Sequence, residues 1–158
     1  HLSIRRQRQM CIRDRPSHIP QRMANRALNL LGAHLEVPLD IRPQRTRSAS
    51  TGAGIFLAVE YSNGRGGFGC IGRKGMPSEA VAERAITDLL GFHESNAAVD
   101  YHLADQLVLP LALAEGASAI RTDQITSHCR TAVDVVRAFI DRPIQIDEQS
   151  RTITFATP

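Results

Sequence analysis

Apolar residues recur every three or four positions in four stretches of the chain, the spacing that places them on one face of an α-helix. Residues with helix-capping side chains stand at the start of the last three: Ser78, Asp100, and either Thr126 or Ser127. Pro110 falls inside the third stretch and should kink it. The predicted helices are residues 17–31, 78 to an end between 92 and 98, 100–114, and 126–142.

Short apolar runs bounded by glycine, proline and asparagine predict β-strands. Residues 54–62 and 68–73 would form a hairpin joined by NGRGG, in which Asn63 and Gly64 supply positive φ angles. These glycines do not indicate a phosphate-binding loop, because that motif requires a turn from strand to helix. Further strands are predicted at residues 35–41, 118–121, 143–147 and 151–156. Helices and strands mixed along the chain predict an α/β or α+β fold, with a domain boundary near residues 95–99.

Three polar residues interrupt the apolar stretch YHLADQLVLPLALA, residues 101–114. His102, Asp105 and Gln106 share a narrow arc of the predicted helix surface. An ionised carboxylate is rarely buried without a partner, because it loses its hydration. The stripe therefore faces either a polar part of the protein or a ligand. In the second case the imidazole could stack on a base while the carboxylate and the amide bind a ribose.

His128 is a second candidate, in the first turn of the predicted helix that begins at Thr126 or Ser127. Unpaired N–H groups and the helix dipole create a positive potential there, which disfavours the imidazolium ion and attracts phosphate. A neutral histidine beside an anion suits attack on phosphorus. On spacing alone, a surface or capping histidine is the simpler interpretation. Cys129 cannot pair with it, because neighbouring helix residues do not face each other.

The composition narrows the class of protein. An apolar fraction of 42% favours a globular fold. No apolar run approaches the ~20 residues of a membrane-spanning helix, so no membrane partner is expected. Three cysteines without CxxC spacing indicate neither a zinc site nor a disulfide framework and suit a reducing, cytoplasmic location. The histidines have no partners at metal-ligand spacing, so the sequence assigns no metal ligands.

The net charge of +3 comes from the first 15 residues. This head holds five arginines against Asp14, and the rest of the chain carries 14 basic and 15 acidic residues. The segment RRQRQMCIRDR lacks periodicity and resembles a translated sequencing adapter, so residues 1–15 are predicted to be non-native and the chain a fragment. A genuine basic arm is the alternative. Arg45 and Arg47 could touch RNA phosphates from a polar loop, but aromatic residues are too few for a base-stacking surface.

The sequence HLADQLVLPLALAEGAS, followed by the TSH of ITSHCRT, resembles the C-terminal part of the RNA 3′-terminal phosphate cyclase family. The stretches SHIPQRMANRALNLL, STGAGIFLAVEYSNGRGGFGCIGRKGMPSEAVAE and FHESNAAVDYHLADQ are similar to the same family in the same order. The resemblance covers roughly residue 16 to the C-terminus. It implies two-layer repeats of helices on a four-stranded sheet, plus a small inserted α/β domain. Residues 16–95 would be the inserted domain, and 96–158 the last repeat of the catalytic core.

The resemblance also implies a reaction, the ATP-dependent conversion of RNA 3′-phosphate ends to 2′,3′-cyclic phosphates by a ligase-class enzyme. The family's nucleophilic histidine, which becomes linked to AMP, falls on His128. His102 takes the adenine-packing place in the nucleotide pocket, and Asp105 and Gln106 take polar contacts. A magnesium or manganese ion would assist at the phosphates. On this interpretation the polar stripe faces ATP.

The chain departs from the family's pattern in two respects. The family continues after the histidine with an apolar pair and an asparagine-containing turn, where this chain has Cys129, Arg130 and Thr131. Family members are also considerably longer. The N-terminal half of the protein, with the basic residues that hold RNA, is therefore expected outside this chain, and the chain alone is predicted to be a weak catalyst or none.

Two other functions stay open at this point. A non-catalytic relative of the cyclases that acts in ribosome assembly would keep the fold without adenylylation, although the presence of His128 favours the enzyme. A generic α/β binding module would use the polar stripe as a protein interface. Substitutions at His102 and Asp105 would then alter oligomerisation without affecting nucleotide binding.

Overall fold

A computed structural model describes residues 18–44 and 52–157 of the chain. The head of residues 1–15 and the pair Arg45 and Arg47 lie outside the described residues. The chain divides into two compact units, which we call unit 1 (up to Gly91) and unit 2 (from Phe92). The predicted boundary between an inserted domain and a catalytic core, after residue 95, stays a prediction, because compactness alone does not identify an insertion.

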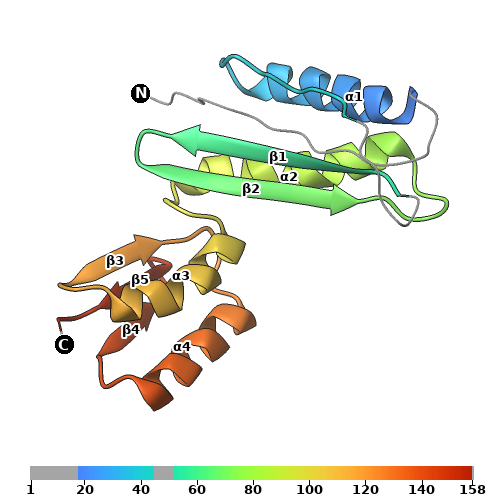
Figure 1. Ribbon diagram of the computed structural model, residues 1–158. Helices are drawn as coiled ribbons and strands as arrows, with labels where there is room; N and C mark the ends of the chain where they lie inside the picture. Colours follow the sequence, from blue (N-terminus) through green and yellow to red (C-terminus); the bar gives the residue numbers. More distant parts are fainter. Residues whose placement is uncertain (1–17, 45–51, 158) are drawn as a thin grey trace. The chain divides into compact units, whose positions relative to one another are not determined.

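Unit 1 consists of a β-hairpin with one face covered by helices (Figure 1). Its elements in chain order are α1 (His18–His34), β1 (Gly54–Tyr61), β2 (Gly64–Ile71) and α2 (Ser78–Ser95), whose last turn passes into unit 2. The strands pair in antiparallel register from Gly54 opposite Ile71 to Tyr61 opposite Gly64. Alternate strand residues and one stripe of each helix form the core, including Met23, Ala27, Leu31, Ile55, Leu57, Val59, Phe68, Val81, Ala85, Ile86 and Leu89. The two helices, the hairpin and their apolar faces were predicted.

Two ion pairs show that α1 and α2 run side by side in the same direction. Arg22 donates from Nε and Nη2 to the two carboxylate oxygens of Glu79 at 2.7 and 2.8 Å. One turn further along both helices, Nε of Arg26 donates to Oε1 of Glu83 at 2.8 Å. These pairs are partly exposed and therefore contribute little stability. They nevertheless show that this charged face of α2 lies against α1.

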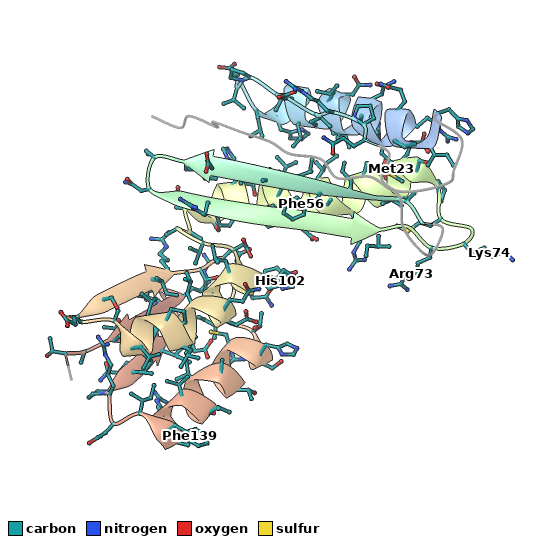
Figure 2. All side chains as sticks on the ribbon, viewed as in Figure 1. Met23, Phe56, Arg73, Lys74, His102 and Phe139 are labelled. Carbon is teal, nitrogen blue, oxygen red and sulfur yellow. The ribbon has the colours of Figure 1, made fainter. Side chains whose placement is uncertain are left out.

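The hairpin turn differs from the predicted one. The strands close over Ser62 and Asn63, and Gly64 already belongs to β2. Neither Asn63 nor Gly64 is among the described residues with positive φ, so that prediction was wrong. Glycine is needed later in the strand for a different reason. A Cβ on Gly67 would lie 2.9 Å from the ring of Phe56, so the absence of a side chain lets this ring lie against β2 (Figure 2).

The predicted strand at residues 35–41 is absent among the described residues. Exposure alternates along this segment, with Leu35 and Ile41 buried at its ends, as in a strand with one buried face. However, the segment makes no ladder of hydrogen bonds with β1 or β2, and Pro38 removes a donor from its centre. Periodicity reports burial, whereas a strand also requires a partner.

Unit 2 is a mixed α/β unit with a small antiparallel sheet. Its elements are α3 (Tyr101–Leu113), β3 (Ser118–Arg121), α4 (Ser127–Phe139), β4 (Ile144–Asp147) and β5 (Thr152–Phe155). The strand order is β3-β5-β4, with β5 central and antiparallel to both neighbours. The mixed class is confirmed, whereas the described residues form sheets of two and three strands and do not confirm four-stranded repeats. No helix in the described part is long and apolar enough to cross a membrane.

The core of unit 2 lies between its sheet and its two helices. It contains Val108, Ala112, Ile125, Cys129, Val133, Val136, Ile144, Ile153 and Phe155. Phe139, an apolar residue at the end of α4, does not join this core and is 86% exposed. The buried stripe of α4 follows Cys129, Val133 and Val136, and Phe139 lies about a quarter of a turn away from it.

The guanidinium of Arg142 joins three segments of unit 2. The residue is only 4% exposed. Its Nη1 donates to the carbonyls of Leu111, Ala112 and Ala114 at the end of α3, and its Nη2 donates to the carbonyl of Gly116. Its Nε donates at 2.6 Å to the carbonyl of Ala156, just after β5. One side chain therefore satisfies the carbonyls that the end of a helix leaves unpaired.

We expect Arg142→Met to lower the free energy of unfolding by about 3 kcal/mol or more. Methionine keeps an apolar stem of similar length, but buried carbonyls lose their donor. Urea denaturation of the full chain measures the loss. Arg121→Met is the matched control, because the Arg121 side chain is exposed and donates to one carbonyl, that of Ser95, at 3.0 Å. An equal loss in both variants would contradict this role of Arg142.

A second prediction concerns Gly72, which follows β2. A Cβ at this position would lie 2.9 Å from the carbonyl oxygen of Ala53, and the Gly72 N–H donates to that oxygen at 2.6 Å. Gly72→Ala should therefore destabilise unit 1 by about 1–3 kcal/mol. Gly32→Ala is the matched control and should stabilise by about 0.5–1 kcal/mol, because Gly32 lies in a helix with open space around it. Thermal melts of both variants test these two predictions. An unchanged Tm in Gly72→Ala would contradict the first.

Candidate functional site

The polar stripe begins at the N-terminus of α3. Asp100 caps this helix, and its Oδ1 accepts hydrogen bonds from the backbone N–H groups of His102 and Leu103, both at 2.9 Å. The His102 side chain is exposed (Figure 2), and its ring lies 4.1 Å from that of Tyr101 between centroids. Asp105 is half-buried and Gln106 is exposed. The stripe therefore faces away from the core of unit 2, which α3 contacts through its apolar side.

His128 lies in the first turn of α4, as predicted. Thr126 is the N-cap residue, and its hydroxyl accepts a hydrogen bond from the N–H of Cys129 at 3.1 Å. His128 is exposed, whereas Cys129 is fully buried in the core. The two neighbours face different sides, in agreement with the prediction that they do not pair. The exposed ring leaves His128 accessible to a ligand that approaches this end of the helix.

Electrostatics place Asp105 close to the first turn of α4. Burial raises the pKa of the Cys129 thiol, the negative charge of Asp105 raises it further, and Arg130 opposes the rise. At the C-terminal ends of the two helices, Arg142, which follows α4, donates to carbonyls at the end of α3. The two helices consequently run in the same direction. Their N-termini, with the stripe on one and His128 on the other, lie at the same end of unit 2 (Figure 1).

Arg130 anchors the start of α4 to the sheet. Its Nε and Nη2 donate to the two carboxylate oxygens of Glu148 at 2.8 and 3.0 Å, and Glu148 lies in the turn between β4 and β5. The sequence identified Arg130 only as a departure from the family's pattern. Its partner is 18 residues away, so local spacing gave no signal for this pair.

Asp123 is a further charged residue that the sequence analysis did not identify. Burial raises the pKa of its carboxyl, and the negative charge of nearby Asp100 adds to the rise. Hydrogen bonds from the Thr122 hydroxyl, at 3.2 Å, and from the backbone N–H of Tyr101 act in the opposite direction. The start of α3 therefore carries two neighbouring carboxyl groups. Its position in the loop between a strand and the next helix cap could have identified Asp123, because functional polar residues often lie in such loops.

Metal ligands are not gathered at this site. Within residues 18–44 and 52–157, no three histidine, cysteine or acidic side chains are grouped so that they could hold an ion. The arrangement instead offers an exposed imidazole at each of two neighbouring helix N-termini, with a carboxylate close to the second. Positive potential at such helix ends favours the binding of anions.

The sequence matches the profile described as "RNA 3′-terminal phosphate cyclase (RTC), insert domain" over residues 4–94. Over 143 residues the chain is 46% identical to the RNA 3′-terminal phosphate cyclase of Trichormus variabilis, which covers 90% of this chain and 40% of that relative. The protein of the same name from Nostoc punctiforme is 46% identical over 140 residues, and that from Methylococcus capsulatus is 44% identical over 124. These matches cover 88% and 78% of this chain, and 40% and 34% of the relatives. The chain thus spans about 40% of the length of the first two relatives.

The raised pKa of Asp123 predicts a pH-dependent stability. Because its carboxyl binds a proton more tightly in the folded chain than in the unfolded one, the free energy of unfolding falls as the pH rises through the raised pKa. Asp123→Asn keeps a hydrogen-bond acceptor but carries no charge. It should raise Tm at neutral pH, and the difference from the parent chain should disappear below the usual carboxyl pKa of 3.8.

Circular dichroism melts at a series of pH values measure this difference. Asp141→Asn is the control, because Asp141 is an exposed carboxylate in the same unit. A rise in Tm of equal size in the control, or one that persists in acid, would contradict the assignment.

Proposed function

The chain belongs to the RNA 3′-terminal phosphate cyclase family, and from this membership we propose that unit 2 carries part of an adenylylation site. His128 is the nucleophile in this proposal, and ATP and an RNA 3′-phosphate end are the substrates. The observation that carries it is the common end of α3 and α4, where His102 and His128 lie in the first turns of the two helices and Asp105 lies one turn further along α3.

The proposed reaction has three displacements. A ring nitrogen of His128 attacks the α-phosphorus of ATP, forming a P–N bond and releasing pyrophosphate. The RNA 3′-phosphate oxygen then attacks the same phosphorus, which frees the histidine and leaves AMP joined to the RNA end. Finally, the neighbouring 2′-hydroxyl attacks the terminal RNA phosphorus, closes the 2′,3′-cyclic phosphate and releases AMP. A covalent intermediate divides one difficult step into easier ones.

The surroundings of His128 fit the first displacement. Negative charge builds up on the α-phosphate during attack, and two helix N-termini supply positive potential without a basic side chain. The exposed ring of His102, already packed against Tyr101, offers a face for an adenine base. Asp105 and Gln106 follow one turn later on the same side of α3 and provide polar contacts for the nucleotide.

Magnesium or manganese would reach the site with the phosphates of ATP. The described residues do not fit a protein-held metal site, because no three potential ligands are grouped. The proposal therefore assigns no step to the metal and no ligand to this chain.

Covalent labelling with α-labelled ATP and magnesium or manganese tests the proposal. Because the chain spans about 40% of its relatives, it is compared with the same chain completed by the preceding part of the Trichormus variabilis relative. We expect label on the completed protein and little or none on the chain alone. The label should be lost in acid and retained in alkali, as expected for a P–N bond.

His128→Ala should abolish this label. His34→Ala is the matched control, because His34 is also an exposed helical histidine but lies in unit 1. Label that survives His128→Ala would reject this nucleophile. A folded, completed protein that takes no label would favour the non-catalytic ribosome-assembly relative.

A further inference from the structure

Unit 1 contains a cavity of about 640 Å³ at the N-terminal end of α2. Its walls come from the first turns of α1, from residues 52–53 before β1, and from the loop between β2 and α2. Four basic side chains line it, those of His18, Arg22, Arg73 and Lys74. None of the described residues that line it is acidic. This cavity takes no part in the adenylylation chemistry proposed for unit 2.

The connection from β2 to α2 has the geometry that the glycines of the hairpin lacked, a turn from strand to helix. It runs from Gly72 to Pro77 and contains a tight turn, in which the N–H of Met76 donates to the carbonyl of Arg73 at 3.0 Å. Gly75 lies third in this turn with φ of +86°, a conformation that glycine adopts readily. The turn therefore fixes the backbone from which the side chains of Arg73 and Lys74 reach the cavity.

Free hydrogen-bond donors line the inner wall of the cavity. Ser78, the first residue of α2, is only 8% exposed, and its hydroxyl makes no hydrogen bond to another described residue. The first N–H groups of a helix also have no partner within the helix, and the helix dipole makes this end positive. Ser118 Oγ is the side-chain atom that is both fully buried and unpartnered in the described part of the chain, so the Ser78 hydroxyl is reachable from the cavity, where it and these N–H groups could donate to an anion.

The charges around the cavity add to this positive end. Arg73 and Lys74 make no ion pair among the described residues, and both side chains extend from the same loop (Figure 2). Arg22 is already paired with Glu79, the acidic residue of the first turn of α2, so the charge of that carboxylate is balanced. The net field at the cavity therefore comes from Arg73, Lys74 and the end of α2.

We propose that this cavity binds a phosphate group of single-stranded RNA, so that unit 1 holds the substrate chain while unit 2 reacts with its end. Ser78 and the first N–H groups of α2 bind one phosphodiester, and Arg73 and Lys74 contact its neighbours along the strand. The anion site follows from the cavity alone. The choice of RNA as the molecule that supplies the anion rests on the proposed function.

The test measures binding of a short fluorescent single-stranded RNA to the full chain by anisotropy, over a series of salt concentrations. Arg73→Ala with Lys74→Ala should weaken binding about tenfold at low salt and reduce the slope of log affinity against log salt by about one to one and a half. Arg65→Ala is the matched control, because Arg65 is an exposed arginine of β2 that does not line the cavity. It should change affinity less than twofold.

A third variant, Ser78→Ala, separates the cavity from general basicity. It removes no charge, so it should weaken binding while leaving the salt slope unchanged. Circular dichroism melts establish that each variant is folded. No RNA binding by the folded parent chain, or equal losses for Arg65→Ala and the double variant, would overturn the proposal.

The choice of RNA ends and competitors identifies the source of the phosphate. RNAs that end in a 3′-phosphate and a 3′-hydroxyl should bind equally, because the cavity holds the backbone; binding of only the first would overturn this assignment. Competition by ATP at the concentration that saturates labelling would assign the cavity to a nucleotide instead. RNA affinity is measured without ATP and does not depend on the label at His128, so failure of the labelling experiment and failure of this proposal can be told apart.

Discussion

The arrangement of unit 2 depends on one buried cation. The guanidinium of Arg142 meets carbonyl oxygens from the end of α3, from the loop that follows it and from the segment after β5. Helix ends buried without such partners are unfavourable, and a planar group with five N–H donors can satisfy several carbonyls at once. Because Arg142 directly follows α4, the contact also fixes the direction of α4 relative to α3, and with it the common end at which the candidate site lies.

Both units cover a small sheet with two helices, but different interactions join those helices. Each has a small antiparallel sheet that buries one face, and neither sheet is large enough to be stable without helices. In unit 1, apolar stripes of α1 and α2 cover the hairpin, and partly exposed ion pairs join the two helices. In unit 2, buried Arg142 joins the C-terminal ends of α3 and α4, and the N-termini of both helices are exposed. Helix N-termini remain available to anions in both units, on the surface beside His128 in one and in the cavity beside Ser78 in the other.

A division of labour between the units follows from the chemistry that each presents. Unit 2 offers imidazole and carboxylate groups at helix ends, which suit attack on phosphorus and contacts to a nucleoside. Unit 1 offers permanently charged side chains and the Ser78 hydroxyl around a cavity, which suit holding an anion without reacting with it. The proposed reaction rests on membership in the cyclase family. Residue spacing in unit 2 indicated only a polar stripe and a histidine at a helix end.

The sequence alone determined the four helices, the hairpin, the cap at Asp100 and the position of His128 in a first turn, because these depend on residues a few places apart. Tertiary structure decided what depends on distant partners. Residues 35–41 have the period of a strand but no neighbour to pair with, and the partners of Arg142 lie up to 31 residues away. The common end of α3 and α4 and the cavity before Ser78 likewise arise only when separate segments pack together, since no local pattern specifies which helix ends will meet.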